Sequence, residues 1–318
     1  MQGILNRRYL RIKVFQAIYA YSQSNNDLLV GEKNMLKSIN DIYDLFLYQL
    51  CLITEITEMA RRNLAQNREK RLPTEEDLNP NTKFVNNKLI EMLDNNKPFQ
   101  KELEKRKINW AIESDNVKKL WKKIRSSDEY LNYMQAEGQS FKADKELIIK
   151  LYKTYIAEFE SLHHFLEDRS IYWMDDLSVV AMNVIMLFNN LKYTEDQERN
   201  LLPSLYKDPE DDAKFVKELY RKTILNHDEL SKRIEKRTQN WDVDRIVRLD
   251  VILMKMALAE LLYFKTIPVK VTLNEYIELA KLYSTPNSKN FINGILDKLV
   301  ADLKSSGEMM KTGRGLIN

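Results

Sequence analysis

One stretch of the chain, residues 248–264, is apolar almost without interruption and reads RLDVILMKMALAELLYF. Its only charged residues are Arg248, Asp250, Lys255 and Glu260, so a helix here is apolar around nearly its whole circumference. Such a helix is either the core of a large helical domain or a membrane span. The charges leave uncharged runs far shorter than the ~18 residues that a span needs. The pattern therefore predicts a fully buried central helix.

Signals for helix ends follow this stretch. Pro268 is expected to end the central helix, because proline cannot continue a helical hydrogen-bond ladder. Thr272 and Glu275 have the spacing of a capping box, which predicts that the next helix opens there. Thr285 followed by Pro286 predicts an N-cap and a first helical residue, and so the start of a last helix.

Apolar residues recur at spacings of three and four along most of the remaining chain, and few runs alternate strictly. The chain has only 7 Gly and 7 Pro, which is few for a sheet-rich protein. The predicted fold class is therefore all-α. The first helix is expected to start near Asn6, and two long helices are expected to pair as an antiparallel hairpin arm. The helices predicted before the central one are 4–22, 32–71, several short ones within 83–135, 142–166 and 171–190.

Arginines cluster at the start of the first predicted helix. Arg7, Arg8 and Arg11 are spaced i, i+1 and i+4, so they share one sector of the helix. Positive charge at a helix N-terminus opposes the helix dipole, which favours anions there. From this spacing alone a solvated basic face is the favoured interpretation, and a surface that binds an anionic partner is the alternative.

The overall charge limits what kind of nucleic-acid site the chain can have. Its 318 residues suffice for two domains or for one domain with a large insertion, and its net charge is only +3. A nucleic-acid site would therefore have to be a local patch. The basic N-terminus is not followed by an apolar signal segment, and no span is predicted. A cytoplasmic protein without membrane contact is expected.

Motifs for catalysis are missing from the sequence. It contains no glycine-rich phosphate loop or dinucleotide fingerprint, and its single cysteine, Cys51, leaves no Cys-rich zinc site. His163 and His164 are adjacent, so they cannot bind one metal in the usual i, i+4 arrangement. We expect no enzyme activity, no cofactor and no metal site.

Two segments of the chain carry a family resemblance. Residues 267–300 contain P-x-K-V-x-x-N-E-x-I-E-L-A-K and F-x-N-G-x-L-D-K, and this combination resembles the C-terminal signature of NusB, the bacterial transcription antitermination factor family. The N-terminal pattern R-R-x-x-R-x-x-x-x-Q-A-x-Y and an N-W-x-x-x-R-I step at 240–246 are also similar to that family. Asn287 and Asn290 depart from it, because many relatives have an acid and a lysine there.

The resemblance implies a division of the chain. Residues 1–22 and 211–303 are expected to form a discontinuous NusB-like helical bundle that binds RNA. Residues 23–210 are expected to be a helical insertion of unknown role, a large inserted arm without a Gly/Ser/Pro-rich linker. Residues 304–318 contain Gly and Ser, and they are expected to form a disordered tail.

The resemblance also implies a function. A member of this family would bind boxA-type single-stranded RNA of ribosomal RNA leaders together with NusE, a small-subunit ribosomal protein, within the RNA polymerase antitermination complex. Arginines would neutralise phosphates and aromatic rings would stack on unpaired bases. Phe291 could equally be a core aromatic at a helix start. The residues implied for RNA binding are Arg7, Arg8, Arg11, Tyr19, Lys289 and Phe291.

Two other functions stay open at this point. The chain could be a helical protein-interaction scaffold whose RNA site is vestigial. It could also be the RNA-binding module of a system that modifies ribosomal RNA. RNA binding that depends on the arginine cluster would favour the antitermination function over the scaffold function. Turnover of a nucleotide cofactor would be needed to support a function in the modification of ribosomal RNA.

Overall fold

The computed structural model describes residues 3–24, 27–170, 172–238 and 247–312. Within these ranges the chain forms helices and no β-strand; one isolated bridge joins Leu5 and Tyr206. The predicted all-α fold class is therefore confirmed. No described helix is long and apolar enough to cross a membrane. The 240–246 step that resembles the family lies outside the described residues.

Two compact units make up the chain. Unit 1 comprises Met1–Ile4 and Asn40–Leu205, and unit 2 comprises Leu5–Ile39 and Tyr206–Asn318. The first boundary falls inside the long helix α2 (Leu28–Arg68), which has no break at that point. The unit boundaries therefore differ from the motif-based boundaries at residues 22 and 211.

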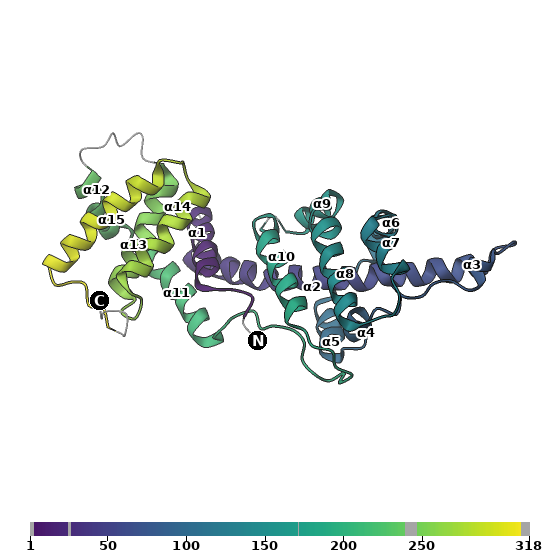
Figure 1. Cartoon of the computed structure of the whole chain (residues 1–318). Coiled ribbons are helices and arrows are strands. Elements are labelled where there is room, and N and C mark those ends of the chain that lie inside the picture. Colours follow the sequence, from purple (N-terminus) through teal and green to yellow (C-terminus); the bar gives the residue numbers. More distant parts are fainter. Residues whose placement is uncertain (1–2, 25–26, 171, 239–246, 313–318) are drawn as a thin grey trace. The chain divides into compact units, whose positions relative to one another are not determined.

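Unit 2, which also includes the first turns of α2, is built around the predicted central helix, α13, which packs against the five helices that lie wholly within this unit (Figure 1). The buried residues of α13 include an unbroken run from Ile252 to Leu261. Burying so much apolar surface in one helix explains why the unit closes around it. The prediction of a buried central helix is confirmed. The helices of unit 2 are α1 (Arg7–Gln23), α11 (Pro209–Leu225), α12 (His227–Thr238), α13 (Arg248–Tyr263), α14 (Val269–Tyr283) and α15 (Ser288–Ser305).

The start of α1 agrees with its sequence signal, whereas the starts of α14 and α15 do not. The Asn6 side chain caps α1 by accepting the Tyr9 N–H at 3.1 Å. The predicted capping box at Thr272 is wrong, because α14 already begins at Val269 and Thr272 lies inside it. The Thr285 N-cap is also wrong, since α15 begins three residues later. In both cases the side chain is engaged in contacts other than a cap.

Polar contacts fix which ends of these helices meet. The Arg248 Nη2 at the start of α13 donates to the Ser22 carbonyl near the end of α1, at 2.7 Å. The Ser284 hydroxyl, which follows α14, donates to Asp250. The start of α13 therefore lies beside the end of α1 and the start of α15, and the C-terminal end of α13 lies beside the start of α1.

Unit 1 has an aromatic core around Tyr48 of α2. The Trp110 and Trp173 indoles each donate to an α2 carbonyl at 3.0 Å, those of Tyr48 and Asp41 respectively. The Tyr48 ring lies 5.5 Å from Trp110 and 5.8 Å from Trp173, between ring centroids. The other helical segments of unit 1 are α3 (Glu75–Leu78), α4 (Lys88–Asp94), α5 (Lys97–Arg106), η1 (Ala111–Glu113), α6 (Ser114–Arg125), α7 (Asp128–Gln135), α8 (Phe141–Leu151), η2 (Tyr152–Ile156), α9 (Glu160–Arg169) and α10 (Trp173–Asn190).

The long helix predicted over 142–166 is interrupted. A π-helical segment, η2, follows α8, and its Ala157 N–H donates to the Tyr152 carbonyl. Phe159 then takes an extended conformation before α9 begins. Figure 1 shows α8 and α9 lying across α2, so the predicted antiparallel hairpin with α2 is not formed.

The C-terminal segment up to Thr312 makes defined contacts. Helix α15 continues to Ser305, two residues beyond the boundary at which the tail was predicted to begin. Gly307 then has a φ of +71°, a conformation that glycine adopts without strain. The Thr312 N–H donates to the Lys265 carbonyl at 2.9 Å. Thr312 is thus placed against the loop that follows α13, and 313–318 lie outside the described residues.

Candidate nucleic-acid interface

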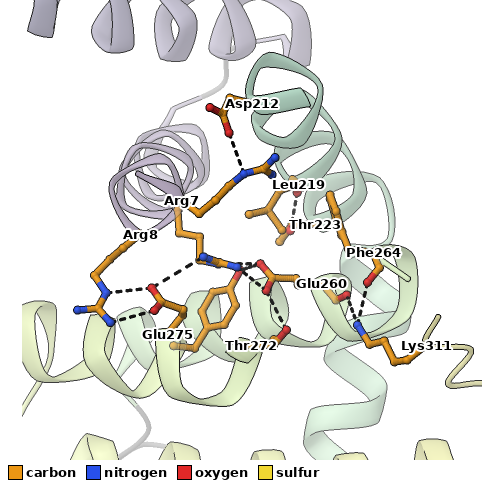
Figure 2. Close-up of polar contacts among 12 residues, drawn as sticks. Arg7, Arg8, Asp212, Leu219, Thr223, Glu260, Phe264, Thr272, Glu275 and Lys311 are labelled. Atoms are coloured by element: carbon orange, nitrogen blue, oxygen red, sulfur yellow. Dashed lines mark hydrogen bonds and ion pairs between the residues drawn. The ribbon is translucent and has the colours of Figure 1, made fainter. Parts of the chain in front are cut away.

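Three arginines at the start of α1 project toward three other helices of unit 2. The exposed fractions of the Arg7, Arg8 and Arg11 side chains are 32%, 41% and 2%. Each guanidinium is paired with a carboxylate of α11, α13 or α14, as Figure 2 shows for part of the network. The cluster is therefore both a surface feature and part of the packing between helices.

Arg11 and Glu260 form a buried, two-pronged ion pair. The Arg11 Nε and Nη2 donate to the two Glu260 oxygens, each at 2.8 Å, and Glu260 is fully buried. The Thr272 hydroxyl donates to the same carboxylate at 2.8 Å, and the Tyr276 hydroxyl donates at 3.3 Å (Figure 2). Burial lowers the pKa of Arg11, but the hydrogen bonds that Arg11 donates to Glu260, together with the negative charges of Glu260 and Glu275, outweigh burial and leave the pKa raised. The expectation that Arg11 is an exposed charge is wrong, because it joins α1 to α13 and α14.

Arg8 is paired in the same geometry but at the surface. Its Nε and Nη2 donate to the two oxygens of Glu275 on α14, each at 2.9 Å. This hydrogen bonding raises the pKa of Arg8. Since a guanidinium has five N–H donors, the exposed edge of Arg8 retains donors for another anion.

Arg7 interacts with α11. Its Nε lies 2.8 Å from a carboxylate oxygen of Asp212, and a terminal nitrogen contacts Asp211 (Figure 2). The Asp212 carboxylate also accepts the N–H groups of Lys207 and Asp208 at 3.1 Å, which holds it in place. The guanidinium of Arg7 stacks over the Phe215 ring at 4.3 Å from the centroid, a favourable cation–π geometry.

The negative charges that stabilise the arginine cluster at the start of α1 belong to the chain itself. Positive charge at the start of α1 opposes the helix dipole, and the carboxylates of Asp211, Asp212, Glu260 and Glu275 offset it. Glu260 could have been suspected from the sequence, because a lone acid in an apolar helix needs a buried partner. The carboxylates on α11 and α14 could not have been identified in this way, because they do not lie in apolar stretches of the sequence.

A cavity of about 740 Å³ lies beside this cluster. Its walls come from the start of α1, from α11, and from the segment that joins α13 to α14. Basic, acidic and aromatic side chains all line it. No group of three or more His, Cys, Asp or Glu that could hold a metal ion occurs in the described ranges. The charged and aromatic residues of its lining are Arg7, Arg8, Arg11, Lys214, Lys265, Asp211, Glu218, Glu275, Phe215, Tyr263 and Phe264.

The Lys311 ammonium binds backbone carbonyls at the C-terminal end of α13, next to this cavity. Its Nζ donates to the Glu260 carbonyl at 3.1 Å and to the Phe264 carbonyl at 2.9 Å (Figure 2). Burial lowers the pKa of Lys311 to about 8. Both carbonyls also accept a backbone N–H, from Phe264 and Ile267 respectively, so Lys311 adds a second hydrogen bond to each. No sequence pattern signals this role for Lys311, because the Gly and Ser residues around it indicate a tail.

The remaining implied RNA-binding residues lie at the other end of α13. Tyr19 is 41% exposed near the end of α1, Lys289 is exposed, and Phe291 is half-buried in the first turn of α15. Ten residues of α13 separate Asp250, near that end, from Glu260, which corresponds to ~15 Å of helix. The structure therefore does not bring the six residues together. The end of α13 next to Arg7, Arg8 and Arg11 is called the arginine end below, and the end next to Tyr19, Lys289 and Phe291 is called the aromatic end.

Part of the chain is similar to known proteins. The NusB family model matches residues 178–301. This match begins inside α10, before the motif-based boundary at 211, and does not include α1. The transcription antitermination protein NusB of Salinibacter ruber is 46% identical over 103 residues, and that of Chloroherpeton thalassium is 41% identical over 104 residues.

These matches cover part of each protein. They span 32% of this chain and 64% of the Salinibacter protein, and 33% of this chain and 49% of the Chloroherpeton protein. The chain thus matches less than two thirds of the length of either relative. A solved structure of T. maritima NusB aligns with 46% of this chain and 87% of its own, at 26% identity and a TM-score of 0.28.

Proposed function

Starting from residues 178–301 as a NusB family domain, we propose that the protein is a transcription antitermination factor. It binds boxA-type single-stranded RNA of ribosomal RNA leaders together with NusE, within the RNA polymerase antitermination complex. The observation that carries this proposal is the 46% identity to an antitermination protein over 103 residues. The proposal assigns no catalytic step to the chain.

Arg7 and Arg8 are the proposed phosphate contacts. Their side chains are 32% and 41% exposed, beside the cavity at the arginine end. A phosphate would compete with exposed carboxylates such as Asp211, which is 70% exposed, and not with the buried Glu260. Arg11 then has a supporting role, because it fixes α1 in place through Glu260.

The aromatic end supplies a separate proposed contact. Tyr19 would stack on an unpaired base, Lys289 would contact a phosphate, and Phe291 would extend the aromatic surface. All residues of α1 from Leu10 to Phe15 are buried, so no exposed strip of α1 joins the two ends. The RNA would therefore make two distinct contacts with unit 2.

The test is the salt dependence of RNA binding by an Arg7→Gln/Arg8→Gln variant of the full chain. Fluorescence anisotropy with a boxA-type RNA, with and without NusE, gives log affinity against log salt. Loss of two phosphate contacts should flatten the slope by about 1.4, at ~0.7 per contact on a single strand. The matched control is Arg233→Gln/Arg237→Gln on α12, because these arginines are also paired with carboxylates. An equal slope in wild type and the Arg7/Arg8 variant would remove the arginine end from the RNA site.

The scaffold alternative has one observation in its favour. All three guanidiniums of the cluster are already paired with carboxylates of the same chain. A scaffold would bind NusE with equal affinity in wild type and the Arg7/Arg8 variant, and would show no preference for boxA-type RNA over a scrambled strand. The same anisotropy series therefore separates the two functions.

A further inference from the structure

Helix α6 of unit 1 has a solvent face composed almost entirely of positive charge. Its buried residues are Val117, Leu120, Trp121 and Ile124, which fall on one side of the helix. The residues on the other side are exposed. At 100° per residue the buried and basic positions occupy opposite sectors. The basic residues of this face are Lys118, Lys119, Lys122, Lys123 and Arg125, which together are called the α6 basic face below.

The α6 basic face is not neutralised by the surrounding protein. Among the described residues, no ion pair or hydrogen bond reaches the side chains of Lys118, Lys119 or Lys122, and the Lys123 ammonium lies 5.7 Å from the Tyr155 ring centroid. Asp115, in the first turn, is the only acidic residue of α6. By contrast, α5 alternates lysine with glutamate, and its Lys105 and Arg106 both pair with Glu102.

Two pairs of lysines on α6 repel each other, although Lys122, Lys123 and Arg125 lie in the last turn, where the helix dipole favours positive charge. Lys118 and Lys122 are four residues apart, as are Lys119 and Lys123, and like charges at this spacing repel one another. The apolar side of α6 is already buried in unit 1, so the basic face contributes nothing to the core. A dense group of cations that repel one another, add nothing to the core and have no partner in the described residues indicates a ligand outside the chain.

We infer that the α6 basic face binds the phosphodiester backbone of RNA without sequence preference. Lysines are flexible point charges suited to phosphates, and they lack the planar geometry that reads base edges. The exposed side of α6 carries no aromatic residue for base stacking. Its five cations extend over ~10 Å of helix, which is enough to meet more than one phosphate. The inference relies on the proposed function only for the choice of RNA over other polyanions.

The structure of α6 argues against a membrane as the ligand of the α6 basic face. A helix that lies on a lipid surface inserts a free apolar face into the headgroup region. In α6 that face, including Trp121, is packed inside the unit. An acidic protein would require a defined pattern of charges, whereas the repeated lysine pairs of α6 fit a uniform polyanion.

The test compares two variants of the full chain that remove equal charge at equal spacing. Lys118→Gln/Lys122→Gln alters the α6 basic face, and Lys101→Gln/Lys105→Gln alters exposed lysines of α5 in the same unit. The probes are a polyuridine strand and a random-sequence RNA duplex, both without boxA. The α6 variant should flatten the salt slope by about 1.4 on the single strand, and the α5 variant should leave the slope unchanged. Comparison of the two probes shows whether single-stranded or duplex backbone is preferred.

The possible outcomes separate this inference from the proposed function. Equal slopes for wild type and the α6 variant, or equal flattening by both variants, would overturn the inference. So would an α6 variant that loses binding to anionic lipid vesicles or to an acidic polypeptide but keeps its RNA slope. The proposed function fails on a different measurement, namely the lack of preference for boxA-type RNA over polyuridine. Matching thermal melts confirm that both variants are folded.

Discussion

Arg8 and Arg11 lie one turn apart on α1 and carry the same charge, yet their surroundings give them different roles. Arg8 is 41% exposed and its ion pair with Glu275 is in contact with solvent. Arg11 is 2% exposed, and its partner Glu260 is fully buried. An ion pair at the surface contributes little to stability, whereas removing one member of a buried pair leaves an uncompensated charge.

This contrast predicts different losses of stability for the same substitution. Arg11→Gln should lower the free energy of unfolding by about 3–5 kcal/mol, because Glu260 would remain buried without its cation. Arg8→Gln should lower it by about 0–1 kcal/mol. Urea unfolding of both variants at neutral pH is the measurement. Similar small losses in the two variants would show that the Arg11–Glu260 pair does not stabilise unit 2.

His227, at the start of α12, provides a pH-dependent prediction. Burial and the nearby Lys255 lower its pKa below the ordinary value of 6.5, and the Lys255 Nζ lies 3.2 Å from the imidazole Nε2. The folded state therefore binds fewer protons than the unfolded state just below pH 6.5. The stability that His227 contributes is present above pH 6.5, and it is lost as the pH falls through the folded pKa.

An NMR titration of the histidine ring protons tests this directly. The His227 pKa should lie below 6.5 in the wild type and should rise in Lys255→Met, since the positive charge beside it is then gone. A pKa at or above 6.5, or one that Lys255→Met leaves unchanged, would contradict the arrangement of these two side chains.

At the scale of helices, the first turns of α2 approach α11 so closely that a glycine is required. A Cβ at Gly31 would overlap the Tyr220 hydroxyl, whose ring is buried. Gly294 in α15 is also helical, but a Cβ there would meet nothing within 4 Å. The two positions therefore form a matched pair for substitution.

Gly31→Ala should destabilise the protein by about 1–3 kcal/mol, the usual effect of overfilling a packed site. Gly294→Ala should stabilise it by about 0.5–1 kcal/mol, because alanine is the better helix former. Thermal melts of the two variants measure both effects. If Gly31→Ala melts at or above the wild-type temperature, the close approach of α2 and α11 is incorrect.

The helices themselves could be predicted from local pattern, but several of their ends could not. The apolar run that forms α13 and the Asn6 cap of α1 are local signals, and both agree with the structure. Thr272 has the sequence of a cap, but its hydroxyl is engaged by Glu260, a residue on a different helix. The break after α8 has no glycine or proline to mark it, and its apolar spacing continues into α9.

At the scale of the whole molecule, the C-terminal sequence motif falls within the part of the chain that the NusB family model matches, but the motifs do not give the compact units. The boundary at residues 39 and 40 lies within α2, where the helical pattern is continuous. The arginine cluster could be found from its spacing alone. Its carboxylate partners lie between 204 and 267 residues away, so spacing gives no access to them. The spacing therefore predicts that these arginines cluster, but it does not predict that their guanidinium groups are paired within the chain or that Arg11 is buried.

The pairing of Arg11 with Glu260 has a consequence for how the protein is made on the ribosome. The two residues are 249 positions apart, and most of unit 1 is synthesised between them. At ~5–20 residues per second, Glu260 follows Arg11 by roughly 10–50 s. Helix α1 has 17 residues, and most of the stability of such a helix in a protein comes from the packing of its apolar residues. During that interval its apolar residues have no α13 to pack against, so nascent chains should depend on chaperones until the last helices emerge.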